Sequence, residues 1–275
     1  MDRFKNLILK TYKIQGSTWL QNLEEIVNFY ANRWHLENLQ VFADLSYNYV
    51  LYGNQNGLPI VLKLSPDPKE LIKERIALNT FSGFGAIGLL DYSSDALLLK
   101  QAIPATKLKE LSNYKNKSSL EIACELMQQL HKAPLLSDKL PHIREWLAIL
   151  NNDWPLDSKL LKEARLWRDE LIKLETQEVV LHGDLHRGNI LLHQNRWVAI
   201  DPKGVIGFPI NEIWTFIEEF QELDFVANYF GFAKENVYKW YFIHLVLASI
   251  WNIEDSLDPN PFFSLAQKMY SKITL

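Results

Sequence analysis

The segment spanning residues 178–201 constrains the fold most, because it sets polar side chains between short apolar runs. Three runs have the composition of short β-strands: Val179–Leu181, Ile190–Leu192 and Trp197–Ile200. The tetrapeptide "HQNR" between the second and third runs predicts a hairpin turn. Asp184, Asn189 and Asp201 follow the ends of these predicted strands, so we expect their side chains to project toward one region.

The spacing of these polar residues is typical of phosphoryl transfer. Asn189 follows Asp184 by five residues, which is the D-x-x-x-x-N spacing of the kinase catalytic loop. Carboxylate and amide oxygens are ligands that Mg²⁺ prefers, so Asn189 and Asp201 are candidate metal ligands. Asp184 is then free to accept a proton from a substrate hydroxyl, and we predict it as the catalytic base.

Two other interpretations of this segment explain less. A structural turn accounts for the neighbouring glycines, but it does not account for the joint spacing of the three polar residues. A zinc site formed by His182, His186 and His193 is the other alternative. Its i,i+4 histidines resemble a helical zinc motif, but Gly183 and the flanking strands are incompatible with a helix, and no glutamate stands where that motif requires one.

The remaining sequence predicts a small β-rich part followed by a larger helical part. The elements expected first are a helix over 17–35 capped by Ser17 or Thr18, strands over 39–65, a helix over 66–81 and two strands over 86–103. After Pro104 the pattern is mainly helical, with helices expected near 118–132, 158–175, 210–223, 235–252 and 262–272. With "QAIPAT" as the connector, we predict an N-terminal lobe over 1–102 and a C-terminal lobe over 103–275.

The block "HGDLHRGNILL", followed by "VAIDPKG", resembles the aminoglycoside phosphotransferase family. The opening "STWLQNLEEIVNFYANRWHLE" and the late "ASIWNIED" are similar to its streptomycin 6-kinase/hydroxyurea-kinase branch, and the likeness runs from about Trp19 to Asp255. The resemblance implies an α+β, protein-kinase-like two-lobed fold, with a small β-rich N-terminal lobe and a larger, mainly helical C-terminal lobe. It also implies an ATP- and Mg²⁺-dependent kinase that transfers the γ-phosphoryl group to a hydroxyl of a small, streptomycin-type acceptor.

In such an enzyme a lysine on the third strand contacts the nucleotide phosphates and pairs with a helix glutamate. Lys63 in "PIVLKLS" is the candidate lysine, although strand alternation alone leaves an exposed lysine equally open. Glu70 and Glu74 are the candidate partners. Because Leu71 and Leu78 flank Glu74 at helical spacing, we expect Glu74 to face inward and Glu70 to be solvated.

The resemblance also implies the remaining nucleotide contacts. The stretch "ADLSYNYV" lacks a glycine-rich cradle, so Ser46 is implied as the residue that covers the phosphates, with an ordinary hairpin turn as the alternative. The stretch "LLLKQAIPATKL" resembles the hinge whose backbone binds adenine, at about Lys100 to Ala102. Gln101 and Ala102 are therefore the hinge candidates.

Four other positions lie near the motif. His182 either orients the catalytic loop or is an ordinary buried histidine, and Lys203 either contacts phosphate or balances Asp201. In the resembled family an aspartate that braces the catalytic loop commonly stands at the position of Glu212, and an acid often stands at that of Phe208.

Composition narrows the class of function. Apolar residues make up 48% and charged residues 23%, values typical of a soluble globular protein. The net charge of −4 does not suggest a nucleic-acid partner, because nucleic-acid-binding proteins usually carry a basic surface. It is compatible with a cationic acceptor. The acidic stretches 218–224 and 252–258 can contact such an acceptor if they are not simply solvated. "WYFIHLVLASIW" is too short to span a membrane, and the start does not read as a secretory signal. Cys124 is the single cysteine, which favours the cytoplasm.

Other functions stay open beside the streptomycin-type kinase. The acceptor can be hydroxyurea or a different small metabolite, or the chain can be a nucleotide-binding pseudo-enzyme. A site that had lost its activity would not need Asp184, Asn189 and Asp201 together, which argues against the pseudo-enzyme. A protein kinase is disfavoured, because the chain lacks the glycine-rich loop and an Ala-Pro-Glu activation segment. These patterns do not predict the acceptor or the oligomeric state.

Overall fold

The computed structural model describes residues 1–135 and 139–274, and its N-terminal part is an antiparallel sheet with flanking helices. The strands occur in the order β1-β2-β3-β5-β4. Their bounds are β1 Leu36–Val41, β2 Tyr49–Gln55, β3 Leu58–Leu64, β4 Leu89–Tyr92 and β5 Ala96–Lys100. Asn56 and Gly57 join β2 to β3 with φ values of 50° and 77°, as a two-residue hairpin turn of this kind requires.

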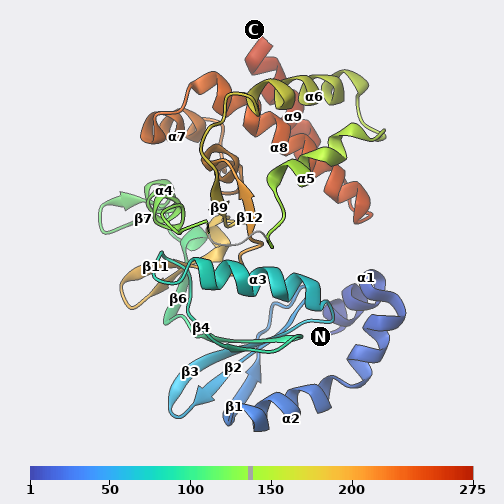
Figure 1. Cartoon of the computed structure of the whole chain (residues 1–275), viewed down its shortest axis with the longest axis vertical. Coiled ribbons are helices and arrows are strands. Elements are labelled where there is room, and N and C mark those ends of the chain that lie inside the picture. The colour runs from blue at the N-terminus through green and yellow to red at the C-terminus, as the bar shows by residue number, and fades with distance from the viewer. Residues whose placement is uncertain (136–138, 275) are drawn as a thin grey trace.

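Helices cover both faces of this sheet (Figure 1). Their bounds are α1 Asp2–Gln21, α2 Leu23–Arg33 and α3 Pro68–Thr80. On one face Ile8 and Trp19 of α1 belong to the same apolar cluster as Ile60 of β3, and on the other face Leu71 of α3 packs with Leu97 of β5. At its C-terminal end β3 therefore buries side chains on both faces, and the consecutive residues Leu62, Lys63 and Leu64 are all buried.

The N-terminal helix starts earlier than the sequence pattern indicates. The prediction that Ser17 or Thr18 caps a helix is wrong: both lie inside α1, which begins at Asp2 and contains a non-helical Lys13 (φ 50°, ψ −122°). Buried Phe4 and Ile8 pack the first turns onto the sheet. This tertiary packing, which the local capping signal does not contain, extends the helix.

The C-terminal lobe is mainly helical (Figure 1). Its α-helices are α4 Ser119–Leu130, α5 Ile143–Ala148, α6 Ser158–Leu171, α7 Glu222–Phe230, α8 Lys234–Glu254 and α9 Asn260–Thr274. Small sheets β11-β10-β6, β12-β9 and β7-β8 are formed by β6 Pro104–Lys107, β7 Asn113–Tyr114, β8 Lys117–Ser118, β9 Val179–Leu181, β10 Ile190–His193, β11 Arg196–Ala199 and β12 Val205–Gly207. The 3₁₀ helices are η1 Leu108–Glu110, η2 Ile149–Asn151, η3 Arg187–Asn189 and the longer η4 Pro209–Thr215.

The structure agrees with the predicted small β-rich and larger helical lobes, and it corrects three details. The helix expected over 210–223 is instead η4, an irregular stretch and α7. The segment after Pro104 first forms β6, which pairs with β10. The short helix α5 was not predicted. Among the described residues, no helix combines the length and apolar character needed to cross a membrane.

Candidate functional site

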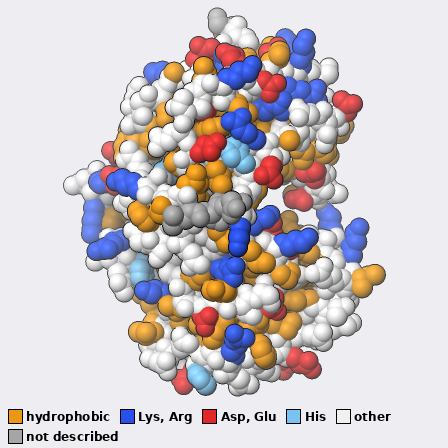
Figure 2. Space-filling view, in the orientation of Figure 1, with side chains coloured by type: hydrophobic (Ala, Val, Ile, Leu, Met, Phe, Trp, Pro, Cys, Tyr) orange, Lys and Arg blue, Asp and Glu red, His pale blue; other side chains and the backbone are white. Residues whose placement is uncertain are grey.

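Residues from both lobes line one cavity of about 280 Å³. The sheet lobe contributes the loop around Ser46, and Lys63 and Glu74. The helical lobe contributes the following residues to the same lining: Asp184, His186, Asn189, Asp201, Pro202 and Lys203. Figure 2 shows the surface hollowed between the lobes, on the side where α1 approaches the end of α8. The same cavity is thus lined by six residues to which the sequence assigned a role in catalysis, metal binding or nucleotide binding: Ser46, Lys63, Glu74, Asp184, Asn189 and Asp201.

Lys63 joins the two lobes electrostatically. Its Nζ lies 2.8 and 2.6 Å from the two carboxylate oxygens of Glu74 on α3, and 3.0 Å from Asp201 Oδ1. Only 5% of Lys63 is exposed, so it is not a surface lysine. Glu70 is exposed and pairs with Lys73 at 2.7 Å, as expected for the solvated alternative.

The pKa values of the two carboxylates that contact Lys63, those of Glu74 and Asp201, are shifted in opposite directions. Burial raises the pKa of Glu74, because its side chain is only 9% exposed and Lys63 offsets only part of the desolvation. The Asp201 side chain is 47% exposed; although burial opposes its charge, the Lys63 ammonium lowers its pKa. Burial likewise opposes the charge of Lys63, but Asp201 and Glu74 raise its pKa. Asp201 is therefore the carboxylate better suited to stay ionised and meet a cation.

The turn after β9 carries Asp184 in a hydrogen-bonded frame. The His182 ring accepts the Asp184 N–H at Nδ1 (3.2 Å), and its Nε2 donates to the Ile200 carbonyl (2.9 Å). Gly183 has φ 81°, a conformation open to glycine. His182 is fully buried, and burial lowers its pKa, so the neutral ring that makes this pair of contacts is favoured. His182 is thus both a core histidine and a link between the loop and the strand before Asp201.

Asn189 and Asp201 present oxygen atoms to the cavity. Asn189 Nδ2 donates to the Asp184 carbonyl (2.9 Å), which directs its amide oxygen elsewhere, and Asn189 lines the cavity. Asp201 Oδ1 faces Lys63, and within the described residues Oδ2 has no partner. One amide and one carboxylate oxygen fit Mg²⁺, which takes its other ligands from phosphate and water. Burial raises the pKa of the Asp184 carboxyl beside them.

Three other sequence candidates have different surroundings. Ser46 is exposed at the rim of the cavity. Gln101 and Ala102 do not line this cavity: the Gln101 N–H donates to the Pro59 carbonyl (3.2 Å), and Ala102 is buried in the apolar cluster that contains Leu191. The N–H of Gln101 is therefore already paired.

The zinc interpretation is wrong. His193 Nδ1 accepts the Ile103 N–H at 3.2 Å and lines a different cavity from His186. His182 is buried with both ring nitrogens bonded to the backbone. Residues 1–135 and 139–274 contain no cluster of three or more His, Cys, Asp or Glu side chains arranged to hold a metal.

Two residues behind the catalytic loop complete its support. The buried Glu212 carboxylate accepts the His182 N–H at 2.5 Å and the Gly183 N–H at 2.9 Å. His131 Nε2 lies 3.5 Å from Glu212 and has no hydrogen-bond partner among the described residues. The sequence indicated the place of Glu212 but not His131, which lies at the C-terminal end of α4.

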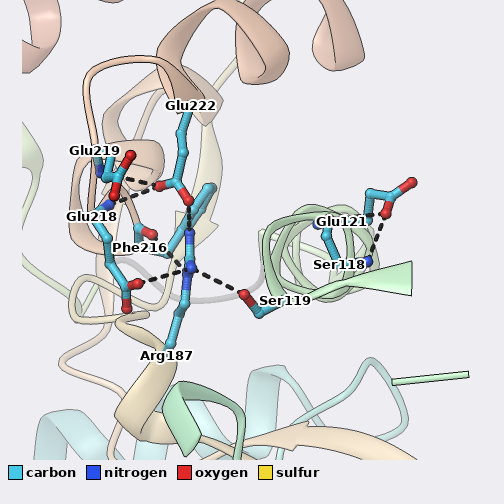
Figure 3. A network of polar contacts seen from close by, with 8 residues as sticks. All are labelled: Ser118, Ser119, Glu121, Arg187, Phe216, Glu218, Glu219 and Glu222. Atoms are coloured by element: carbon cyan, nitrogen blue, oxygen red, sulfur yellow. Dashed lines mark hydrogen bonds and ion pairs between the residues drawn. The ribbon is translucent and has the colours of Figure 1, made fainter. Parts of the chain in front are cut away.

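Arg187, to which the sequence pattern assigns no role, anchors the loop on its other side (Figure 3). It is 6% exposed, and its guanidinium contacts four groups: Ser119 Oγ, the Phe216 carbonyl, Glu218 and Glu222, at 2.5 to 3.1 Å. Two carboxylates of the acidic stretch 218–224 are therefore already paired with Arg187.

The two-lobed fold and this cavity define a class, the phosphotransferases of protein-kinase-like fold. Residues 33–210, more than half of the chain, match the family of aminoglycoside/hydroxyurea antibiotic resistance kinases, and the chain belongs to that family. A streptomycin 6-kinase from Streptomyces glaucescens is 24% identical, with 89% of each chain covered. A hydroxyurea phosphotransferase from Kitasatospora aureofaciens is 27% identical over 73% of this chain and 64% of its own. Membership makes the chain a phosphotransferase.

Solved structures support the fold. Aminoglycoside phosphotransferase APH(4)-Ia, in a ternary complex with ADP and hygromycin B, matches with a TM-score of 0.67 and 13% identity over 90% of this chain and 96% of that one. Choline kinase LicA from Streptococcus pneumoniae matches with a TM-score of 0.68 and 11% identity over 91% and 99%. These likenesses confirm the predicted protein-kinase-like fold.

Proposed function

We propose that this protein is an ATP-dependent kinase that transfers the γ-phosphoryl group to a hydroxyl of a small, aminoglycoside-like acceptor of the streptomycin type. The observation that carries the proposal is the cavity in which Lys63, already paired with Glu74, also meets Asp201, with Asp184 on the same wall. Such a site combines positive charge for phosphates with a free base. Relatives named as streptomycin kinases support the acceptor class, with hydroxyurea as the alternative.

Each residue has a distinct role in this proposal. Lys63 contacts the nucleotide phosphates, and Glu74 fixes the position of its ammonium. Asn189 and Asp201 would hold Mg²⁺, which would neutralise charge on the phosphates when bound. Ser46 covers the phosphates from the loop above the cavity.

Asp184 accepts the proton of the acceptor hydroxyl. As this O–H bond breaks, the oxygen bonds to the γ-phosphorus and the bond from that phosphorus to the ADP oxygen breaks, so the products are a phosphate ester, ADP and a proton on Asp184. Because burial raises the pKa of Asp184, it is a stronger base than a solvated aspartate.

The nucleotide base would lie between the lobes, against the hinge. Ala102 and the apolar side chains of Val61, Leu191 and Ile200 form one cluster there. Since the Gln101 N–H is paired, we assign the adenine contacts to the Gln101 carbonyl and the Ala102 backbone. In this assignment the hinge divides a nucleotide-binding lobe over 1–102 from a catalytic and acceptor-binding lobe over 103–275, in a protein of the cytoplasm.

ADP release with Mg-ATP over streptomycin, other aminoglycosides, hydroxyurea and simple amino-sugars tests the function. We expect acceptor-dependent release, and we expect Asp184→Asn to lower kcat at least about 100-fold while Mg-ATP still binds, because only the proton acceptor is lost. Binding of Mg-ATP without release for any acceptor would favour a pseudo-enzyme. Unchanged turnover in Asp184→Asn would remove Asp184 from its role.

A further inference from the structure

Three tryptophans from separate elements form one aromatic wall in the helical lobe. Trp146 of α5, Trp214 of η4 and Trp251 of α8 make up this wall. The ring centroids of Trp146 and Trp251 lie 5.6 Å apart at 85°, and those of Trp214 and Trp251 lie 6.2 Å apart at 47°. Trp251 belongs to the stretch "ASIWNIED", which the phosphoryl-transfer site does not use.

The wall touches the catalytic loop. A Cβ placed on Gly183 would lie 3.0 Å from Cη2 of Trp146 and 3.2 Å from Cβ of Lys203, which lines the phosphate cavity. Trp146 is therefore in van der Waals contact with the residue before Asp184. A molecule resting on this wall lies beside the proposed base.

The wall packs against the core of the helical lobe on one side and is not enclosed on the other. All three tryptophans are only partly buried, and no hydrogen bond to a described residue is formed by their indole N–H groups. His244 supports the wall from behind: its ring stacks on Trp214 with centroids 5.4 Å apart and an angle of 2°. Burial lowers the pKa of His244 to about 3, so this ring is neutral and adds no positive charge that would repel a cation.

Two carboxylates continue the wall at the end of α8. Glu254 and Asp255 follow Trp251 by three and four residues, are exposed, and make no ion pair with any described residue. Acidic groups at a helix C-terminus oppose the helix dipole, and no basic residue occupies the last turn of α8. A cation held here would be stabilised by both carboxylates and by the helix end.

The end of α8 also faces the nucleotide side of the molecule. Lys10 Nζ of α1 donates to the Asp255 carbonyl at 3.2 Å, and the charge of Asp255 contributes to the raised pKa of Tyr47, after burial, which is the larger cause. Tyr47 lines the phosphate cavity. The wall and its carboxylates thus run from the catalytic loop to the rim of the cavity.

We propose that Trp146 and Trp251 bind the ring of the acceptor, and that Asp255 with Glu254 binds an ammonium or guanidinium group on that ring. This inference rests on the proposed kinase function and names the residues that choose its acceptor. Tryptophan faces bind rings and cations, and a carboxylate pair adds charge-assisted hydrogen bonds. The free indole N–H groups supply donors for ring hydroxyls.

Streptomycin is the probe, and calorimetric titration without nucleotide is the first measurement, so that binding is separated from turnover. We expect Asp255→Asn and Trp251→Leu each to raise the Kd for streptomycin at least tenfold. Glu24→Gln is the matched control, because it removes one exposed carboxylate of α2 on the other lobe and should leave Kd within twofold. Steady-state assays should give a raised KM for streptomycin and an unaltered KM for Mg-ATP in Asp255→Asn.

The outcomes separate the subsite from the kinase function. Streptomycin turnover by the wild-type protein, with unchanged Kd in both variants, would overturn the subsite and leave the function standing. Streptomycin binding that the variants weaken, without any phosphate transfer, would keep the subsite and remove the function. A wild-type protein that binds no streptomycin, or binds only neutral hydroxyurea, would overturn the subsite. If Glu24→Gln weakened streptomycin binding as much as Asp255→Asn does, the effect of both variants would be long-range charge attraction, and the subsite would be overturned.

Discussion

The geometry of the catalytic loop depends on one buried carboxylate. Glu212 accepts two consecutive backbone N–H groups, those of His182 and Gly183, from 30 and 29 residues along the chain. No lysine or arginine pairs with Glu212 in the described residues, and His131 at 3.5 Å is its nearest basic side chain. The backbone just before Asp184 is thus fixed from a distant segment.

Replacing Glu212 with glutamine tests this support. The amide keeps one oxygen acceptor but turns an NH₂ group toward the second loop N–H, so one buried donor loses its partner. We expect a loss of about 1–3 kcal/mol in the free energy of unfolding. We also expect at least a tenfold lower kcat, because a small displacement of a catalytic group is costly. Urea denaturation and ADP release measure the two effects.

Glu219→Gln is the matched control for Glu212→Gln, because Glu219 is exposed and its side chain makes no contact in the network of Figure 3. Both measurements should stay near wild-type values in this variant. Wild-type kcat in Glu212→Gln would show that the loop keeps its geometry without the carboxylate.

The sequence predicts the surroundings of a side chain best where they depend on residues close by in the chain. Glu74 over Glu70 follows from helical spacing within one helix, and the structure pairs Glu74 with Lys63. The burial of Lys63 does not follow from alternation along β3, because it requires helices on both faces of the sheet. His131 carries no local signal, because its relation to Glu212 arises only from tertiary packing.

At the scale of elements, Arg187 ties the catalytic loop to α4 and α7 (Figure 3). Glu222 accepts the backbone N–H of Glu218 while it binds Arg187. These contacts fix an irregular segment between η4 and α7, which explains why apolar periodicity alone wrongly predicted one continuous helix over 210–223. Side-chain contacts from the catalytic loop decide where α7 begins.

We expect Arg187→Met to lower the free energy of unfolding by about 2–4 kcal/mol. It leaves Glu222, whose side chain is 20% exposed, without its cation, and removing one partner of a buried pair is costly. Glu218 adds little, because its side chain is 56% exposed. The double variant Arg187→Met/Glu222→Gln should recover part of the loss. Urea denaturation of Arg187→Met, Glu222→Gln and the double variant beside the wild type forms the cycle.

Lys117→Met is the surface comparison for this cycle. Lys117 pairs with Glu125 at 2.5 Å, but both side chains are well exposed and the pair is screened by water, so we expect little change in the free energy of unfolding. If Arg187→Met costs no more than Lys117→Met, the Arg187 network does not stabilise the fold.

At the scale of the whole molecule, contacts between described residues of the two lobes hold the lobes together. The Lys63–Asp201 ion pair crosses the cavity, the backbone of Ala199 hydrogen-bonds to Gly85 and Ile87 of the sheet lobe, and Lys10 of α1 donates to the Asp255 carbonyl. Only the first joins two residues that the kinase motif assigns to one site. The contact of α1 with α8 joins residues 245 positions apart and leaves no periodic or spacing signal.

The rate at which a thiol reagent labels Cys124 reports how often the folded protein opens. It is fully buried on α4, and burial raises the pKa of its thiol to about 12, so at pH 8 almost no thiolate forms in the folded state. We expect labelling by a thiol reagent to require opening of the core and to be far slower than in urea. Because a ligand that binds only the folded state adds RT ln(1 + [L]/Kd), Mg-ATP at about 100 times its Kd should slow labelling about 100-fold.

Asp201→Asn links this labelling experiment to the proposed site. Without the Asp201 carboxylate, Mg-ATP binds more weakly, so the same nucleotide concentration should protect Cys124 much less, whereas Cys124→Ala gives the blank. Fast labelling of the native protein at pH 8 would show that the thiol is accessible. Slow labelling that Mg-ATP does not change would mean that α4 opens locally, without releasing the nucleotide cavity.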